Sequence, residues 1–327
     1  MRLLLLHDSF GRPLLNLRIA VTQRCNYQCT YCHREGEDAV NCVSNCAEMS
    51  VEEIVRIAKV AVDLGVTRVK LTGGEPLMRK DICQIVAGIS SIFGLKDLSL
   101  TTNGSMLLGI AKDLYAAGLN RINISLATLN AQTYSRLTLG NNLDEVLAGI
   151  ETAVKAGFSP VKLNMVILKG INEQDIPNMI AYTEKLGAIL QLIELDPINV
   201  SKAYYNQHHC DLKNQEDKLR QEAIIIKQRQ FMHNRSIYEL PNTTVEVVHP
   251  IENTDFCMHC TRLRLTSNGK LKQCLMQNDK LTDILTPIRQ GISNKELEQL
   301  FIQANQQREP YNKPSDKSIY NLNSRKN

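Results

Sequence analysis

The sequence predicts an α/β fold in which six strand–helix units form a partial barrel of the TIM type. Between residues 17 and 194, short β-branched or aliphatic runs alternate with longer stretches of helical periodicity. Repeated units of this kind form parallel strands joined by right-handed crossovers, and six units fall short of the eight in a complete barrel. Binding sites in such folds lie at the carboxyl ends of the strands, so the residues that follow each strand are the first functional candidates.

Each expected strand is an apolar run that ends at a polar or glycine-bearing segment. The expected strands are residues 17–21, 68–71, 98–101, 121–124, 161–166 and 190–194. The expected helices between them are residues 51–64, 80–92, 107–117, 143–156 and 175–186. Ser50 stands three residues before Glu53, which is the signature of a capping box at the first helix. Glycines close behind four of these helices fit the usual signal for a helix end.

The pattern changes after Asn199. Residues 201–235 are polar and predict an insertion with some helix, and residues 243–248 predict another strand. Residues 303–327 are polar and predict a tail that is disordered or lies on the surface. We therefore expect a core barrel over residues 8–225. Residues 226–327 are expected to form a C-terminal region with the second cysteine group, part of the substrate site and the tail.

Composition narrows the functional classes. Apolar residues make up 43% and charged residues 22% of the 327 residues, as in ordinary globular proteins. The net charge of +4 gives no case for nucleic-acid binding. The leucine run at residues 3–6 is shorter than a secretory signal needs, and no apolar run is long enough for a membrane span. We expect a cytoplasmic protein whose ten cysteines stay reduced and whose clustered cysteines bind metal.

The most informative motif is C-x3-C-x2-C, formed by Cys25, Cys29 and Cys32 just after the first expected strand. Iron–sulfur clusters are held by cysteine thiolates, normally four for a four-iron cluster. Three ligands leave one iron open, and an open metal position is where chemistry takes place. The alternative is a zinc knuckle in which His33 supplies the fourth ligand.

A second group of three cysteines, Cys257, Cys260 and Cys274, repeats this logic. Arg262 and Arg264 lie between them, two residues apart, so both point to one face of an extended strand. Two guanidinium groups beside a metal site are suited to binding phosphate. The alternative is a basic strand that faces solvent.

The first cysteine loop, with the aromatic Tyr31 before its last cysteine, resembles that of the radical S-adenosylmethionine (SAM) enzymes. From about residue 8 to residue 289 the chain is similar, more specifically, to the GTP 3′,8-cyclases of molybdenum-cofactor biosynthesis. The segments that carry the resemblance are residues 8–12, 17–19, 71–77 (LTGGEPL), 101–104 (TTNG), 123–126 (NISL), 161–164 (VKLN), and both cysteine groups. The resemblance implies a radical SAM barrel with a C-terminal extension that carries a second iron–sulfur cluster.

The resemblance also implies a reaction. A 5′-deoxyadenosyl radical from SAM would abstract the C3′ hydrogen of GTP, and a C3′–C8 bond would give (8S)-3′,8-cyclo-7,8-dihydroguanosine 5′-triphosphate. The implied cofactors are two [4Fe-4S] clusters and SAM. The implied partners are GTP as the substrate, a reductant such as flavodoxin or ferredoxin, and the cyclic pyranopterin synthase that follows in the pathway. Neither a nucleic acid nor a membrane is expected as a partner.

Residue roles follow from the same resemblance. Cluster 1 is assigned to Cys25, Cys29 and Cys32, and cluster 2 to Cys257, Cys260 and Cys274. SAM is assigned to Tyr31, Gly74 and Ser125. GTP is assigned to Arg18, Lys70, Thr101, Lys162, Arg262, Leu263 and Arg264. Arg262 and Arg264 are also assigned a catalytic role in stabilising charge. Lys70 and Lys162 lie within apolar strands, where a charged side chain needs a partner, so a ligand site inside the barrel explains them.

The chain departs from the family at several positions. Lys70 stands where many members have arginine, and Ala127 stands where aspartate is frequent. Asp196 falls near a position that is often held by a methionine that contacts SAM. Residues 324–327 (SRKN) stand where bacterial members have paired glycines. Cys42 and Cys46 form an extra pair, interpreted as incidental thiols, and Cys210 beside two histidines is a weak metal candidate. Two other functions remain open. One is a different radical SAM enzyme with an auxiliary cluster, acting on a peptide or cofactor; the other is a zinc-stabilised binding protein without enzymatic activity.

Overall fold

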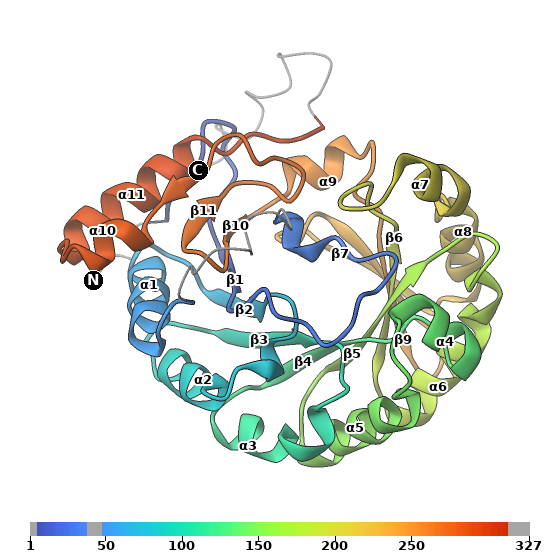
Figure 1. Cartoon of the computed structure of the whole chain (residues 1–327). Helices are drawn as coiled ribbons and strands as arrows, with labels where there is room; N and C mark the ends of the chain where they lie inside the picture. Colours follow the sequence, from blue (N-terminus) through green and yellow to red (C-terminus); the bar gives the residue numbers. More distant parts are fainter. Residues whose placement is uncertain (1–4, 38–47, 313–327) are drawn as a thin grey trace.

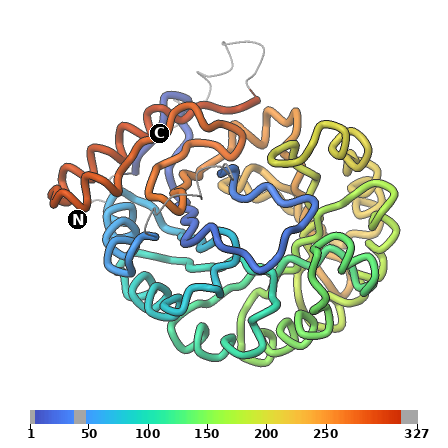
Figure 2. Tube along the Cα trace, viewed as in Figure 1, coloured from blue at the N-terminus to red at the C-terminus, as the bar shows by residue number. Residues whose placement is uncertain are grey.

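The protein was analysed as a computed structural model, which describes residues 5–37 and 48–312. Its strands form one sheet in the order β12-β11-β10-β1-β2-β3-β4-β5-β6-β9-β8-β7, which curves around a central space with helices on the outside (Figure 1). The Cα trace shows the same outer ring of helices and inner wall of strands (Figure 2). Cys42, Cys46 and residues 313–327 lie outside the described residues.

Six consecutive parallel strands form the core of this sheet. They are β1 (Asn16–Ala20), β2 (Arg68–Thr72), β3 (Asp97–Thr102), β4 (Arg121–Ser125), β5 (Val161–Ile167) and β6 (Ile189–Glu194). The helices that accompany them are α1 (Val51–Asp63), α2 (Ile82–Ser90), α3 (Ala111–Ala116), α4 (Ala131–Thr138), α5 (Leu143–Ala156) and α6 (Ile176–Leu186). Every predicted strand is confirmed to within one residue at each end. Helix α4 was not predicted, because it is short and mostly polar.

The sheet continues beyond the six-stranded core on both sides. Beside β1 lie β10 (Arg262–Leu265, parallel), β11 (Lys270–Lys272) and β12 (Thr282–Asp283). Beside β6 lie β9 (Thr244–Val248, parallel), β8 (Arg235–Glu239) and β7 (Ile225–Arg229). The predicted domain boundary between residues 225 and 226 therefore falls inside β7, in a sheet that runs on without a break. The remaining helices are α7 (Lys202–His208), α8 (Lys213–Glu222), α9 (Thr254–Met258), α10 (Leu285–Arg289) and α11 (Asn294–Gln306).

The start of the predicted tail is ordered by packing. Residues 303–306 complete helix α11, and Arg308 is only 1% exposed. Asn305 in the same segment donates a hydrogen bond to the carbonyl of His7, so the two ends of the described chain lie side by side. The prediction of a disordered tail is wrong for this stretch, because Asn305 and Arg308 donate hydrogen bonds to backbone carbonyls. No helix of the described residues is long and apolar enough to cross a membrane.

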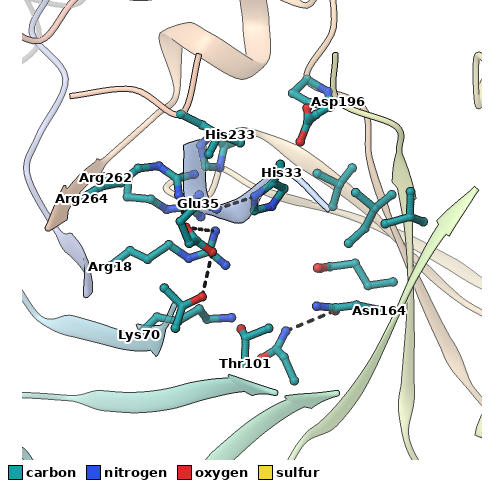
Figure 3. A pocket seen from close by; sticks show the side chains of 18 of the residues that line it. Arg18, His33, Glu35, Lys70, Thr101, Asn164, Asp196, His233, Arg262 and Arg264 are labelled. Carbon is teal, nitrogen blue, oxygen red and sulfur yellow. Dashed lines mark hydrogen bonds and ion pairs between the residues drawn. The ribbon is translucent and has the colours of Figure 1, made fainter. Parts of the chain in front are cut away.

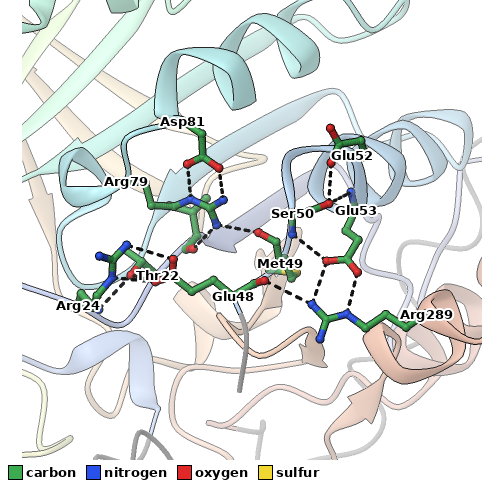
Figure 4. A network of polar contacts seen from close by, with 11 residues as sticks. Thr22, Arg24, Glu48, Met49, Ser50, Glu52, Glu53, Arg79, Asp81 and Arg289 are labelled. Atoms are coloured by element: carbon green, nitrogen blue, oxygen red, sulfur yellow. Dashed lines mark hydrogen bonds and ion pairs between the residues drawn. The ribbon is translucent and has the colours of Figure 1, made fainter. Parts of the chain in front are cut away.

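A polar network fastens the first cysteine loop to the rest of the fold (Figure 4). Arg24, in that loop, donates two hydrogen bonds of 3.1 Å to the carboxylate of Glu48. The buried guanidinium of Arg79 donates to the carbonyls of Val21 and Met49. Helix α1 begins directly after this segment in the predicted capping box of Ser50 and Glu53. The end of β1, the loop and α1 are thereby held together.

Candidate active site

One cavity of about 330 Å³ opens among the carboxyl ends of the strands, a size usual for small-molecule sites. All six predicted cluster cysteines line it, although the two groups lie more than 220 residues apart in the sequence. The first group follows β1 and the second flanks β10, and these two strands pair directly. The sheet order therefore brings the two groups to the same cavity.

Backbone amides close to the first cysteine group donate hydrogen bonds to its sulfur atoms. The amides of Tyr27 and Arg34 donate to the sulfurs of Cys25 and Cys32, each at 3.4 Å. Hydrogen bonds of this kind adjust the charge and potential of an iron–sulfur cluster. Burial, followed by the neighbouring thiols of Cys32 and Cys25, raises the pKa of Cys29 to about 12. The pKa values of Cys25 and Cys32 are raised as well, and a bound cation would favour the thiolate forms of all three.

The segment after β2 packs so closely against this loop that only glycine fits at position 74. The amide of Gly74 donates to the carbonyl of Thr22 at 2.8 Å. A Cβ atom on Gly74 would lie 2.3 Å from the carbonyl oxygen of Arg24, in the loop that carries Cys25. Glu75 follows, buried, and its carboxylate accepts hydrogen bonds from Thr102 and from the amide of Asn103 at the end of β3. The ends of three strands are thus fixed relative to the first cysteine group.

Replacing Gly74 with alanine is therefore expected to displace the first cysteine loop. The added methyl group meets backbone rather than a flexible side chain, so the loop itself must move. We expect the variant to lose SAM binding, measured by equilibrium dialysis after anaerobic reconstitution. Gly170→Ala is the matched control, because a Cβ atom there meets nothing within 4 Å, although its φ of +74° adds some backbone strain. SAM binding by the Gly74 variant at the level of the control would contradict this view of the loop.

Two arginines outside the predicted site hold the second cysteine group. Arg12 donates to the carbonyl of Cys257 at 2.9 Å, and Arg308 donates to the carbonyl of Cys260 at 2.6 Å. Burial would raise the pKa of Cys260, but Arg308 and Arg12 outweigh it and lower that pKa. Asp8 ties the arginines together, 2.8 Å from Arg12 and 3.7 Å from Arg308. Sequence reasoning missed Arg308, because it lies in the stretch assigned to the tail.

Three cationic side chains lie at the same level on three adjacent strands. Arg264, Arg18 and Lys70 occupy the same level of β10, β1 and β2 in the sheet register. Glu35 lies among them (Figure 3): Arg264 donates a hydrogen bond of 2.6 Å to its carboxylate, and Arg18 forms an ion pair with it at 3.6 Å. Burial alone would raise the pKa of Glu35, but Arg18 and Arg264 together hold it well below its usual range. Sequence reasoning missed Glu35, which carries no motif signal.

Two cations in the cavity remain without an anion. Among the described residues, the side chains of Lys70 and Arg262 have no hydrogen bond and no ion pair. Burial, followed by the nearby Arg18 and Arg121, lowers the pKa of Lys70 well below its usual value. Partly buried cations without an ion pair are costly, so they mark a place for an anionic ligand.

Unsatisfied polar atoms point to the same place. Five buried side-chain polar atoms lack a partner in the part of the chain that the structure describes, and three of them belong to cavity residues. These three are Arg18 Nε, Thr101 Oγ1 and Asp196 Oδ1. Buried polar groups are normally paired, so a ligand that supplies both donors and acceptors would complete this cavity.

The structure places all but one of the predicted site residues on the cavity wall. Those on the wall, besides the cysteines, are Arg18, Tyr31, Lys70, Gly74, Thr101, Ser125, Lys162, Arg262 and Arg264. Leu263 is the exception. Its side chain is fully buried in the hydrophobic core on the opposite face of β10, because side chains alternate along a strand. The side chain of Leu263 therefore does not reach the cavity in which GTP is expected.

The departures from the family have local explanations. Ala127 is buried in a small apolar cluster against which Tyr31 packs, so that position offers tyrosine an apolar floor instead of a carboxylate. Asp196 lies on the cavity wall near His33 (Figure 3), and burial raises its pKa. Cys83 packs against the core from helix α2. Cys210 is not grouped for metal, since His209 beside it binds Glu194.

Comparison with known proteins decides the family. Residues 19–183 match the Radical SAM superfamily, and residues 188–314 match Molybdenum Cofactor Synthesis C. The chain belongs to the radical SAM superfamily. Among curated relatives, it is 47% identical over 313 residues to the "Probable GTP 3′,8-cyclase" of Thermococcus kodakarensis, covering 94% of this chain and 99% of that one. It is 43% identical to the protein of the same name from Methanocaldococcus jannaschii, covering 93% of this chain and 98% of that one.

Solved structures support the radical SAM fold. Streptococcus suis SuiB aligns with a TM-score of 0.60 at 17% identity, over 84% of this chain and 64% of its own. The structure of native anSMEcpe with bound AdoMet aligns with a TM-score of 0.60 at 17% identity, over 89% of this chain and 81% of its own. As a radical SAM protein, the chain binds SAM and [4Fe-4S] clusters, and both cysteine groups suit that chemistry. The two family matches favour this chemistry over a zinc-stabilised binding protein.

Proposed function

We propose that this radical SAM protein is a GTP 3′,8-cyclase. The observation that carries the proposal is the shared cavity: both cysteine groups line one space, and its wall also holds two partly buried cations that have no ion pair among the described residues. A nucleoside triphosphate supplies the missing anions. Because the curated relatives of that name match nearly the whole chain, the substrate is assigned to GTP rather than to a peptide.

The chain's own residues divide the work between the two cysteine groups. Cys25, Cys29 and Cys32 would hold the SAM-binding cluster, with Gly74 and Ser125 at the adjoining strand ends. Tyr31 lines the cavity and packs on a buried apolar cluster, so its ring offers a surface for a flat purine. When bound, the iron–sulfur cluster of the first cysteine group and SAM would supply a carbon-centred radical that removes the C3′ hydrogen of GTP ribose.

The second group would hold the other end of the reaction. Cys257, Cys260 and Cys274 leave one iron without a protein ligand, where the guanine base is assigned. Arg262 and Arg264 project from β10 into the cavity beside it, and Glu35 fixes the guanidinium of Arg264. Arg262, which has no ion pair with a carboxylate among the described residues, would bind phosphate or stabilise developing negative charge. The protein thereby orients C3′ toward the first group and C8 within bonding reach.

Replacing both Arg262 and Arg264 with alanine is expected to abolish GTP binding while leaving the first cluster intact. Each charge-assisted hydrogen bond contributes about 1.5–3 kcal/mol, so losing two weakens binding by several powers of ten. Calorimetric titration with GTP and the visible spectrum of the clusters would measure the two properties. A double variant that still binds GTP normally would favour another radical SAM reaction.

Product analysis tests the proposal itself. The reconstituted protein, supplied anaerobically with SAM, GTP and dithionite, should release 5′-deoxyadenosine and a cyclised guanosine triphosphate, separated by liquid chromatography and mass spectrometry. Absence of both products, in protein that carries about eight iron atoms per chain, would remove the assignment. We further propose that a reductant such as flavodoxin or ferredoxin supplies the electron in the cytoplasm, and that a cyclic pyranopterin synthase takes up the product.

A further inference from the structure

One buried carboxylate behind the cavity wall gathers three cations, of which only Lys162 is predicted from the sequence. Glu246 on β9 is 2% exposed, and it does not itself line the cavity. Its Oε1 atom accepts hydrogen bonds from Lys162 and from Nη1 of Arg229, the latter at 3.0 Å. Its Oε2 atom accepts from Gln191 at 2.7 Å and lies 3.8 Å from Nη1 of Arg235. The carboxylate is therefore surrounded by its donors.

The charges in this cluster do not balance. Lys162, Arg229 and Arg235 carry three positive charges against the single negative charge of Glu246, which leaves two uncompensated. All three cations line the cavity, and the side chains of Lys162 and Arg235 are only 5% and 9% exposed. An ion pair that served stability alone would need one cation, since surplus buried charge is destabilising. A further anion in the cavity would balance the cluster.

The two arginines come from a hairpin that the family motifs do not include. Arg229 ends β7 and Arg235 begins β8, and the two residues stand directly opposite each other in the antiparallel register. Both guanidinium groups consequently reach the same part of the cavity wall, beside Lys162 on β5. Lys162 in turn lies close enough to Lys70 to lower the pKa of that lysine. The cationic side chains of the cavity thus extend from β2 across to β8.

We infer that Arg229 and Arg235 bind the polyphosphate of the nucleotide substrate, with Glu246 as the residue that positions them. This inference rests on the proposed function, and it names which part of the substrate the hairpin recognises. A guanidinium presents a rigid fork of donors that matches phosphate oxygens, and two forks beside a lysine suit a chain of phosphates. Glu246 holds both guanidinium groups in position before the substrate binds, so binding costs less side-chain entropy.

The test compares ligands that differ in phosphate number. GTP, GMP and inorganic tripolyphosphate are titrated calorimetrically into anaerobically reconstituted protein without reductant, so that no turnover occurs. Arg229→Ala and Arg235→Ala should each raise the Kd for GTP and for tripolyphosphate by about 10- to 100-fold. Both variants should change the Kd for GMP much less. Arg229→Lys should lie between, because it keeps the charge but loses the fork.

Lys227→Ala is the matched control, since Lys227 lies on the same strand but pairs with Glu239 away from the cavity. It should bind all three ligands as the wild type does. Arg229 is 24% exposed, so its variants are expected to fold, and cluster content checks this. Unchanged GTP binding in both arginine variants would overturn the inference, as would equal weakening for GTP and GMP.

The outcomes separate this inference from the proposed function. If the wild type binds GTP and the arginine variants bind it equally well, only the inference is overturned. Wild-type protein that binds tripolyphosphate through Arg229 and Arg235, but not GTP, would uphold the phosphate site and overturn the choice of substrate. Protein that binds neither ligand would overturn both.

Discussion

Replacing Cys29 with alanine is expected to abolish the formation of 5′-deoxyadenosine. The remaining two thiols of that loop cannot hold a four-iron cluster in the way that three do, whereas the second group is untouched. Iron should therefore fall from about eight to about four atoms per chain, with the loss confined to the cluster that binds SAM. Iron analysis and chromatography of the SAM cleavage products measure both effects.

Cys83→Ala provides the control for the loss of a thiol. Cys83 lies in helix α2 and packs against the core, away from the cavity. Its variant should retain both clusters and full SAM cleavage, with at most a small loss of stability. If the Cys29 variant kept about eight iron atoms, or if the Cys83 variant lost half of its iron, the assignment of the first cluster would be wrong.

Replacing Glu35 with glutamine is expected to be the most destabilising single change in the cavity. Glu35 is 8% exposed and compensates the buried guanidinium groups of Arg18 and Arg264. Removing one partner of a buried ion pair leaves uncompensated charge and costs about 3–5 kcal/mol of unfolding free energy. The thermal unfolding midpoint of the reconstituted protein should fall clearly, and GTP binding should weaken because both arginines lose their anchor.

The matched control is Glu151→Gln, which breaks an exposed ion pair with Lys155. Such surface pairs contribute at most about 1 kcal/mol, so its unfolding midpoint should stay close to the wild type. The pH dependence gives a second check. Because the pKa of Glu35 is lower in the folded protein, its contribution is present above the unfolded value of about 4.3 and is lost as pH falls below it. The difference between wild type and Glu35→Gln should shrink over that range; a difference independent of pH would contradict the ionised role of Glu35.

The parallel core could be predicted from sequence because its strands are continuous apolar runs separated by helical periods. The cysteine groups could be predicted because ligand spacing is a local property. The β7–β8 hairpin could not, since β7 is an exposed edge strand whose pairing, rather than its own pattern, defines it. Its arginines reach Glu246 and Lys162 only through that pairing and through the pairing of β8 with β9.

Contacts across long sequence distances explain most of the remaining differences. Glu35 lies 229 residues from Arg264, and Arg308 lies 48 residues from the carbonyl that it binds. Neither partner carries a sequence signal for the other. Leu263 is a different case: the alternation that placed Arg262 and Arg264 on one face of β10 already directs Leu263 to the opposite face. The strand pattern is thus confirmed for the side chain of Leu263, and its assignment to GTP stays a prediction.

The most direct test of a shared cavity uses GTP with deuterium at C3′. A radical generated at the first cysteine group can take that atom only if the ribose, held from the second group, lies within reach. After anaerobic turnover with SAM and a reductant, mass spectrometry should find deuterium in the 5′-deoxyadenosine. Unlabelled 5′-deoxyadenosine, formed at the same rate in the presence of the labelled nucleotide, would show that the two groups do not act on one substrate.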